Sequence, residues 1–364
     1  MSRCYILGAG FSNAVADLPP MKQLTGKFEE VLRREEELGH GNRVFWGRQL
    51  LEYLERFERR FFVEPCLGRG EQYSWCNFKE NIEAIVSFID LNLASTIEAH
   101  VTDAQGKSSH RAKDCAFWEG CDLRQLRGDI ATYLYLALIG PHTPSPLLEA
   151  FVDCLSEGDV VITFNYDLVV DSELWRRRKW NPRNGYGPTF NSPGISQEAS
   201  KVPTRFRIYK LHGSLNWSSR GPFEGPLTLQ GFYEDGKPIF PGYLADESPP
   251  PYGRYQGGQA PCWVMPSFIK KFDVPELLTV WGLAQEAIKA SEEVIVIGYS
   301  LPEADAAACL LLGAARLREK GLTIVDHKAR DLCRKFKRIT GAEAVETFTE
   351  VAEYVKRRRT PSGS

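Results

Sequence analysis

The sequence predicts an α/β protein in which a doubly wound parallel sheet carries a large helical insertion. Short, mainly apolar runs at 4–7, 160–164, 293–297 and 321–325 are typical of strands that are buried on both faces. Stretches with helical spacing of apolar residues separate these runs, and the longest such region is 21–157. Alternating strands and helices favour a parallel sheet with right-handed crossovers.

The composition excludes several other classes of protein. Of the 364 residues, 43% are hydrophobic and 25% are charged, which is ordinary for a folded domain. The net charge of −2 gives no long-range field that would attract nucleic acid or an anionic membrane. Nine cysteines without a CxxC pair predict neither a disulfide framework nor a zinc ribbon. The N-terminal residues 1–8 lack a long apolar h-region, and no window reaches the roughly 18 apolar residues of a membrane helix, so we expect a cytoplasmic protein with no membrane segment.

The first half of the chain predicts one strand followed mainly by helices. The strand at 4–7 ends in a glycine turn, and a new helix begins directly after it. Apolar spacing then predicts helices around 28–32, 50–57, 82–93, 123–138 and 147–155. Gly158 lies just past the last of these helices, as expected for a helix end. We therefore assign residues 21–157 to a helical module.

From Asp159 onward, strands and helices alternate. Strands are predicted at 160–164, 207–211, 293–297 and 321–326, an edge strand at 344–345, and helices at 274–290 and 328–339. Pro302 is expected at the first position of a further helix, and loops with a hairpin at 227–239 are expected between 181 and 266. We expect residues 1–20 and 158–348 to form the sheet domain, and 349–364 to form a C-terminal helix and basic tail.

The turn Gly8-Ala9-Gly10 is the first candidate for ligand binding. Such a turn lets the backbone approach a pyrophosphate, and the helix that follows offers free N–H groups and its positive dipole end. Asn13 occupies the place of the third glycine in the dinucleotide fingerprint G-x-G-x-x-G, which disfavours an ordinary dehydrogenase. The alternative is that the turn only packs a helix onto the sheet.

Asn165 and Asp167 follow the strand at 160–164, at the carboxyl end where open α/β sheets bind ligands. Asn165 is a candidate for holding a sugar hydroxyl, and Asp167 for accepting a hydrogen bond from a carboxamide. Both residue types would equally suit a strand end that caps the following helix. Both interpretations stay open at this stage.

His212 directly follows the strand at 207–211 and is one of six histidines. An imidazole titrates near neutral pH, so His212 is a candidate general base, and Gly213 would leave room for a ligand beside it. A hydrogen-bonded structural histidine at the start of a loop is the alternative.

Gly298 and Ser300 follow the strand at 293–297 in the same way. They would offer backbone N–H groups and a hydroxyl to a phosphate or ribose, and Asp326, which ends the next strand, would lie near an adenosine ribose. Helix capping by Ser300 explains the segment equally well.

Taken in order, four segments of the chain resemble the sirtuin-like family. They are Gly8-Ala9-Gly10-Phe11-Ser12, Thr163-Phe164-Asn165-Tyr166-Asp167, Lys210-Leu211-His212-Gly213-Ser214 and Gly298-Tyr299-Ser300-Leu301-Pro302. The likeness is closest to the prokaryotic branch of the family that acts in antiviral defence. It implies a Rossmann-like sheet that binds NAD, with the pyrophosphate at Gly8, Ala9, Gly10, Phe11 and Ser12.

The resemblance also implies roles for the other candidates. Asn165 and Asp167 would lie near the nicotinamide ribose and amide, and His212 would be the base. Ser300 would lie near the adenosine phosphate, and Asp326 would occupy the ribose-binding strand end. Because the cysteine spacing does not offer the four-cysteine zinc module of deacylase sirtuins, we expect no metal.

The function implied by this resemblance is an NAD+ glycohydrolase that releases nicotinamide and ADP-ribose and depletes the cofactor in antiphage defence. Two alternatives are an NAD-dependent protein deacylase and a non-catalytic nucleotide-binding scaffold subunit. Members of this branch commonly act as homo-oligomers with a partner such as a HerA-type ATPase or a separate sensor subunit, so a partner of this kind is expected.

A basic segment near the C-terminus raises the question of nucleic-acid binding. Nine basic residues against three acidic ones lie between Arg316 and Arg338, and Lys356 to Arg359 add four more. A solvated or subunit-facing helix surface explains this charge better than a DNA-binding groove does. Contact with nucleic acid is therefore expected only locally or through a partner.

Overall fold

The computed structural model describes most of the chain. The described residues are 2–58, 82–94, 101–102, 108–109, 117–118, 121–139, 145–188, 190, 195, 201–219, 227–233, 237, 260–268, 270, 274–302, 305–314 and 317–359. Of the hairpin predicted at 227–239, only residues 227–233 and 237 belong to this part of the chain. The predicted tail beyond Arg359 lies outside it.

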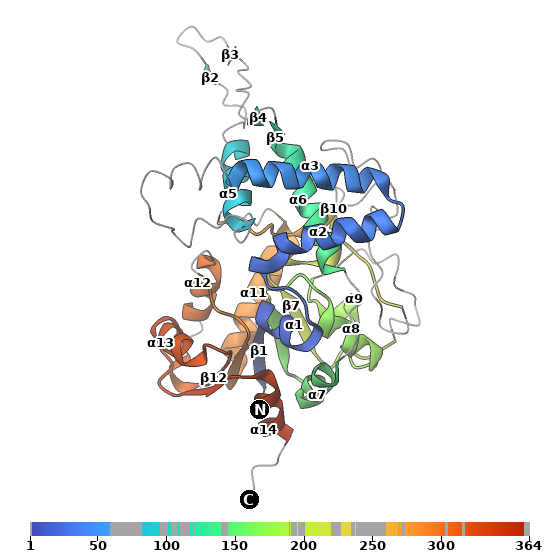
Figure 1. The fold of residues 1–364 in the computed structure, drawn as a ribbon. Coiled ribbons are helices and arrows are strands. Elements are labelled where there is room, and N and C mark those ends of the chain that lie inside the picture. Colours follow the sequence, from blue (N-terminus) through green and yellow to red (C-terminus); the bar gives the residue numbers. More distant parts are fainter. Residues whose placement is uncertain are drawn as a thin grey trace, which may run out of the picture.

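Six parallel strands form the central sheet of an α/β fold, which confirms the predicted fold class (Figure 1). In spatial order they are β13 (Val345–Phe348), β12 (Gly321–Val325), β11 (Glu293–Ile297), β1 (Arg3–Leu7), β6 (Val160–Thr163) and β7 (Arg207–Lys210). Each strand pairs with its neighbours in parallel register. The central strands are buried on both faces, which is why they read as continuous apolar runs in the sequence.

The order of the strands creates a switch point at the centre of this Rossmann-like sheet. The chain runs from β1 outward through β6 to β7, then returns to β11 on the other side of β1 and continues to β12 and β13. The connections that leave β1 and β11 therefore diverge between two neighbouring strands. Open α/β sheets bind ligands at such points, beyond the carboxyl ends of the strands.

The helices that follow these strands complete the sheet domain. They are α1 (Ala9–Ala16), α7 (Pro146–Cys154), α8 (Val169–Arg176), α9 (Pro182–Gly185), α11 (Pro275–Ala290), α12 (Ala306–Ala314), α13 (Ala329–Thr340) and α14 (Val351–Arg359), with a short 3₁₀ helix at Leu317–Glu319. The prediction that Pro302 opens a helix is wrong, because α12 begins at Ala306. Ahead of this helix, the Asp305 N–H donates to the Pro302 carbonyl oxygen over 2.9 Å.

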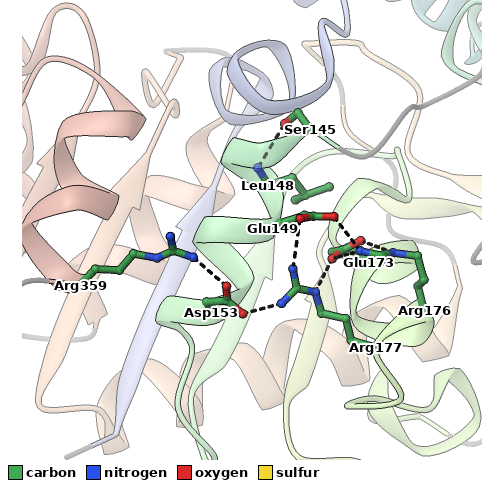
Figure 2. Close-up of polar contacts among 8 residues, drawn as sticks. All are labelled: Ser145, Leu148, Glu149, Asp153, Glu173, Arg176, Arg177 and Arg359. Carbon is green, nitrogen blue, oxygen red and sulfur yellow. Dashed lines mark hydrogen bonds and ion pairs between the residues drawn. The ribbon is translucent and has the colours of Figure 1, made fainter.

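Helix α7 belongs with the sheet by its contacts, although the predicted boundary at 157 would group it with the helical module. It packs against α1, α8 and α14. Its N-terminus is well defined, because the Leu148 N–H donates to the Ser145 hydroxyl over 3.1 Å and Pro146 occupies the first turn. Figure 2 shows this cap and the ion pairs that join the three helices α7, α8 and α14.

The helical module consists of α2 (Met21–Glu37), α3 (Gly41–Glu58), α5 (Ile82–Ala94) and α6 (Leu123–Leu138), as the apolar spacing predicts. Phe28, Leu50, Ile85 and Ile130 are among its buried side chains. Two short antiparallel strand pairs are also described, β2 (Val101–Thr102) with β3 (Ser108–Ser109) and β4 (Phe117–Trp118) with β5 (Cys121–Asp122), of which β5 contacts α6. In Figure 1 the four helices lie beyond the end of the sheet at which β1 leads into α1.

A small antiparallel sheet occupies part of the region predicted as loops. It consists of β10 (Ala260–Trp263), β8 (Gly213–Ser219) and β9 (Thr228–Leu229). The loop prediction is wrong here. The polar residues on β8 suggest an exposed segment, but Ser214, Asn216 and Ser218 are fully buried. In a strand with one solvated face, such polar residues would be the exposed ones. Hydrogen bonds within the fold satisfy them, such as the one from the Asn216 amide to the Gln230 carbonyl oxygen at 2.9 Å.

None of the helices within the described ranges is long and apolar enough to span a lipid bilayer.

Candidate active site

Gly8, Gly10 and Gly298 bring the turns after β1 and β11 into direct backbone contact. A Cβ atom on Gly8 would lie 2.5 Å from the Gly298 carbonyl oxygen. Gly298 has a φ of +61°, and a Cβ atom there would lie 2.2 Å from the backbone nitrogen of Phe11. The glycines therefore let the two turns pack closely against each other. This is the packing role that the sequence offers as the alternative to ligand binding.

The start of α1 nevertheless faces outward. Ala9 and Gly10 are exposed, so the positive end of the helix dipole is accessible at the switch point. The Gly10 N–H donates to the Gly298 carbonyl oxygen and the Phe11 N–H to the Gly8 carbonyl oxygen, each over 2.9 Å. The Gly8 N–H likewise donates to the Ile297 carbonyl oxygen over 3.0 Å, so three of the amides predicted to bind a pyrophosphate have partners within the fold. Ala9 is the exposed residue at which an anion would meet this turn.

Asn165, Ser12 and Asp167 form one hydrogen-bonded chain across the ends of β1 and β6. The Asn165 amide donates to the Gly8 carbonyl oxygen at 2.9 Å and to the Ser12 hydroxyl at 2.8 Å. The Ser12 hydroxyl in turn donates to the Asp167 carboxylate at 2.7 Å. Because a carbonyl oxygen can only accept, the contact with Gly8 fixes which end of the Asn165 amide is the nitrogen.

This chain leaves one polar atom of Asn165 for a ligand. Its amide nitrogen is used twice, whereas its Oδ1 has no hydrogen-bond partner among the residues that the structure describes, and the side chain is partly exposed. On the inner side, a cavity of about 10 Å³ between Ser12, Asn165 and Asp167 holds at most one water molecule. A ligand would therefore reach Asn165 from the exposed side of the turn.

The contacts of Asp167 bear on both roles that the sequence leaves open, helix capping and ligand binding. Its Oδ1 accepts from the Val169 N–H over 3.2 Å at the start of α8, and its Oδ2 accepts from Ser12. With both oxygens engaged, Asp167 holds the loop and the Ser12 hydroxyl in place. Its predicted contact with the nicotinamide amide would have to share these oxygens.

His212 lies buried at the end of β7, surrounded by aromatic rings. Its ring centroid is 5.3 Å from that of Phe164 and 6.2 Å from that of Tyr166, the two neighbours of Asn165. The Phe164 ring also stacks on Tyr299, with centroids 4.2 Å apart. Residues from β6, β7 and β11 thus meet at the carboxyl edge of the sheet, and His212 and Asn165 belong to the same edge.

Sequence reasoning missed Asp305, which lies directly beside this histidine. Its Oδ2 is 3.6 Å from Nε2 of His212 and accepts a 2.8 Å hydrogen bond from the Tyr299 hydroxyl. Asp305 is 2% exposed. The sequence signal for Asp305 is only that of an acidic residue shortly after Pro302, in a segment where Ser300 is the named candidate.

The electrostatics favour a neutral imidazole beside an ionised carboxylate. Burial lowers the pKa of His212, and Lys270 lowers it further, against the opposing effect of Asp305. For Asp305, burial alone would raise the pKa, but His212, Lys270 and the Tyr299 hydroxyl together hold it below its usual value. A neutral imidazole at neutral pH is the form that can accept a proton.

A buried lysine supports the loop that carries Asn165. Lys210, on β7, is fully buried, donates to the Asp167 carbonyl oxygen and lies 3.5 Å from the Asp171 carboxylate. Burial raises the pKa of Asp171, while Lys210 and the hydrogen bond from Tyr186 act in the opposite direction. Lys210 therefore holds the loop 163–167 in position. Because its side chain is fully buried, it offers no surface that a ligand could contact.

The three remaining candidates lie at the same edge of the sheet but in different settings. Gly213 does not leave room for a ligand on the side of its missing Cβ, because a Cβ atom there would lie 2.2 Å from the Cys262 carbonyl oxygen of β10. Ser300 is exposed at the end of β11. Asp326 follows β12, where its carboxylate accepts from the Lys328 N–H at 2.8 Å.

A larger cavity lies away from these groups. It measures about 690 Å³ and is lined by the C-terminal half of α1, by Lys27 and Arg34 of α2, and by Ser145. Neither Asn165 nor His212 lines it. The hydrogen-bonding groups of the candidate site converge instead at the switch point.

Within the described ranges, no group of three or more His, Cys, Asp and Glu side chains is arranged to hold a metal ion. The comparisons with known proteins give no match, either to a protein-family model or to a curated protein.

Proposed function

We propose that the protein is an NAD+ glycohydrolase of the sirtuin-like type, acting at the carboxyl edge of the sheet. The reaction is NAD+ + H₂O → nicotinamide + ADP-ribose + H⁺. The observation that carries the proposal is that two side chains on one edge of the sheet have polar atoms without partners in the described part of the chain. Asn165 has its amide nitrogen held by Gly8 and Ser12 and its Oδ1 available, and His212 has its Nε2 available. The resemblance of the four segments to sirtuin-like proteins supplies the substrate.

The proposed chemistry requires little acid catalysis. The bond between the ribose C1′ and the nicotinamide nitrogen breaks, and its electron pair leaves with nicotinamide, whose cationic ring becomes neutral. The ribose passes through an oxocarbenium-like transition state, as in glycoside cleavage. A water oxygen then bonds to C1′, and the proton it loses passes to Nε2 of His212. Asn165 Oδ1 would accept a hydrogen bond from the ribose or the water and hold it in line.

The same proposal covers the biological setting that the resemblance implies. NAD+ depletion by a cytoplasmic homo-oligomer, with a partner such as a HerA-type ATPase or a sensor subunit, would serve antiphage defence. The reaction needs no metal. The basic surface near the C-terminus would take up nucleic acid only locally or through that partner.

The test is NAD+ consumption by the purified full-length chain without any peptide, with products separated by chromatography. We expect nicotinamide and ADP-ribose to accumulate, and His212→Ala and Asn165→Ala each to lower the rate by about 10²- to 10⁴-fold. His40→Ala is the matched control, because His40 lies in the helical module beside Glu35 and should leave the rate unchanged.

Other outcomes would replace this proposal with another. Turnover that requires an acylated peptide would indicate a deacylase, and saturable NAD+ binding without turnover would indicate a scaffold. Absence of both binding and turnover would contradict the sirtuin-like assignment. Unchanged turnover in both variants would contradict the roles of Asn165 and His212.

A further inference from the structure

At the carboxyl edge of the sheet, two buried polar atoms of neighbouring side chains have no hydrogen-bond partner among the residues that the structure describes. They are Nε2 of His212 and Oδ1 of Asp305. The side chains that carry them are 7% and 2% exposed. The separation of 3.6 Å between Nε2 and the second carboxylate oxygen, Oδ2, is too long for a hydrogen bond. A buried polar atom without a hydrogen bond is energetically unfavourable. Two such atoms on side chains that lie next to each other in space therefore indicate a binding site, in which a bound group supplies the missing hydrogen bonds.

The chemistry of the two atoms shows what that group must supply. Nε2 of His212 has no hydrogen-bond partner in the described part of the chain. In the neutral ring that carries its proton on Nδ1, Nε2 is an acceptor, and this is the form that a general base requires. Oδ1 of the ionised Asp305 is also an acceptor. A group with two O–H donors, such as a water molecule or a vicinal diol, matches both atoms.

We propose that Asp305 is the positioning residue of His212, and that the two side chains together bind the hydroxyl donor that loses its proton to Nε2. This inference rests on the proposed function, in which the donor is the attacking water or the ribose diol. Asp305 accepts the second O–H of the donor and stabilises the imidazolium once His212 is protonated. The Tyr299 hydroxyl, bonded to Oδ2 at 2.8 Å, keeps the carboxylate aimed at this place.

Charges from the surrounding elements act on the same pair. Lys270, in the segment before α11, lowers the pKa values of both His212 and Asp305. Glu83 of α5 has a pKa raised mainly by burial and to a lesser extent by Asp305, so the helical module also contributes a titratable group. Tyr166 and Tyr299 have strongly raised pKa values and stay neutral near pH 7. Of the carboxylates in the described part of the chain, Asp305 is the one that lies beside the imidazole.

The experiment is an NMR titration of the His212 ring in the full chain, with its signal assigned by its loss in His212→Ala. We expect Asp305→Asn to lower the pKa of His212 by about one unit or more, because it removes the neighbouring negative charge. Asp305→Glu should restore part of that pKa. Asp129→Asn is the matched control, since Asp129 is also a buried aspartate but lies on α6 of the helical module.

NAD+ turnover provides the second measurement. We expect Asp305→Asn to lower kcat/KM by about 10- to 100-fold, comparable to the loss of an outer-shell carboxylate that orients a metal-bound histidine. The acidic limb of its pH profile should move to lower pH together with the imidazole titration. Thermal melting checks folding, and Asp305→Glu takes the place of the Asn variant if that variant unfolds.

The outcomes separate this inference from the proposed function. An unchanged His212 titration in Asp305→Asn, or unchanged turnover in that variant while His212→Ala is inactive, would overturn the role of Asp305. A shifted titration in a protein that hydrolyses no NAD+ would support the His212–Asp305 pair and overturn the reaction assigned to it. A shift of the same size in Asp129→Asn would also overturn the pairing.

Discussion

Gly298 demonstrates how a single residue sets the geometry of the switch point. Its φ of +61° lies in the left-handed region, and its missing side chain admits the backbone of Gly10 and Phe11. A side chain at this position would therefore meet two separate penalties, one from the backbone conformation and one from the contact with α1. Because the Gly298 turn packs against the start of α1, both penalties bear on Ser12 and Asn165 as well as on stability.

We expect Gly298→Ala to lower the free energy of unfolding by about 2–5 kcal/mol. About 1–2 kcal/mol comes from the left-handed conformation and the rest from overlap with α1. Gly341→Ala is the matched control, because Gly341 has a similar φ of +73° but nothing within 4 Å of its would-be Cβ. Its loss of unfolding free energy should be only the conformational part, about 1–2 kcal/mol. Denaturant unfolding measures both variants, and equal losses would show that contact with α1 contributes nothing.

At the scale of elements, an ion-pair network joins α7, α8 and α14. Glu173 on α8 binds both Arg176 and Arg177, and Arg177 also binds Asp153 on α7, which in turn binds Arg359 on α14 (Figure 2). The Glu173 side chain is only 1% exposed, whereas that of Glu149 on α7 is 45% exposed. Since solvent weakens exposed pairs, the buried carboxylate should dominate the network.

We expect Glu173→Gln to lower the free energy of unfolding by about 1–3 kcal/mol. This is less than for a fully buried pair, because Arg176 and Arg177 remain partly exposed. Glu149→Gln removes a carboxylate that contacts the same two arginines in water, so its effect should stay below about 1 kcal/mol. Chemical denaturation of both variants decides the matter, and a larger loss for Glu149→Gln would contradict the argument from burial.

The same elements show which features a sequence can reveal. Apolar runs and helical spacing are local patterns, so β1, β6, β11 and the helices α5 and α6 were predictable. Asn165 and His212 were identifiable as candidates because each follows such a strand directly. Asp305 was not, because its importance depends on contact with His212, 93 positions away in the chain (305 − 212). The strand β8 was missed for a related reason: its polar residues are satisfied by distant partners.

At the scale of the whole molecule, the helical module is connected to the candidate site through a series of side chains. Tyr135 of α6 contacts Trp263 of β10, with ring centroids 6.1 Å apart. Trp263 contacts Tyr166 at 5.0 Å, and Tyr166 lies beside His212. On α5, the Ser87 hydroxyl accepts from the Phe268 N–H over 2.7 Å. The module and the sheet edge are therefore packed together, so the stability of the module bears on the site.

Asp129, within that module, should make the stability of the whole chain depend on pH. It is buried on α6, its Oδ2 lacks a hydrogen-bond partner in the described part of the chain, and burial raises its pKa to about 7 from an ordinary value of 3.8. Between those two values the unfolded chain releases a proton that the folded chain keeps. The contribution of Asp129 to folding therefore becomes less favourable as pH rises from about 4 to about 7, and stays constant above that.

We expect Asp129→Asn to remove this dependence. Relative to the natural chain, the variant should gain stability steadily between about pH 4 and pH 7, by at most about 4 kcal/mol, since each pKa unit corresponds to about 1.4 kcal/mol. His212, whose pKa is lowered, acts in the opposite sense, favouring the folded state as pH rises toward 6.5. Its effect is the same in both chains and cancels in their difference. Denaturant unfolding at several pH values measures that difference, and a constant difference would show that Asp129 is ionised in the folded protein throughout this range.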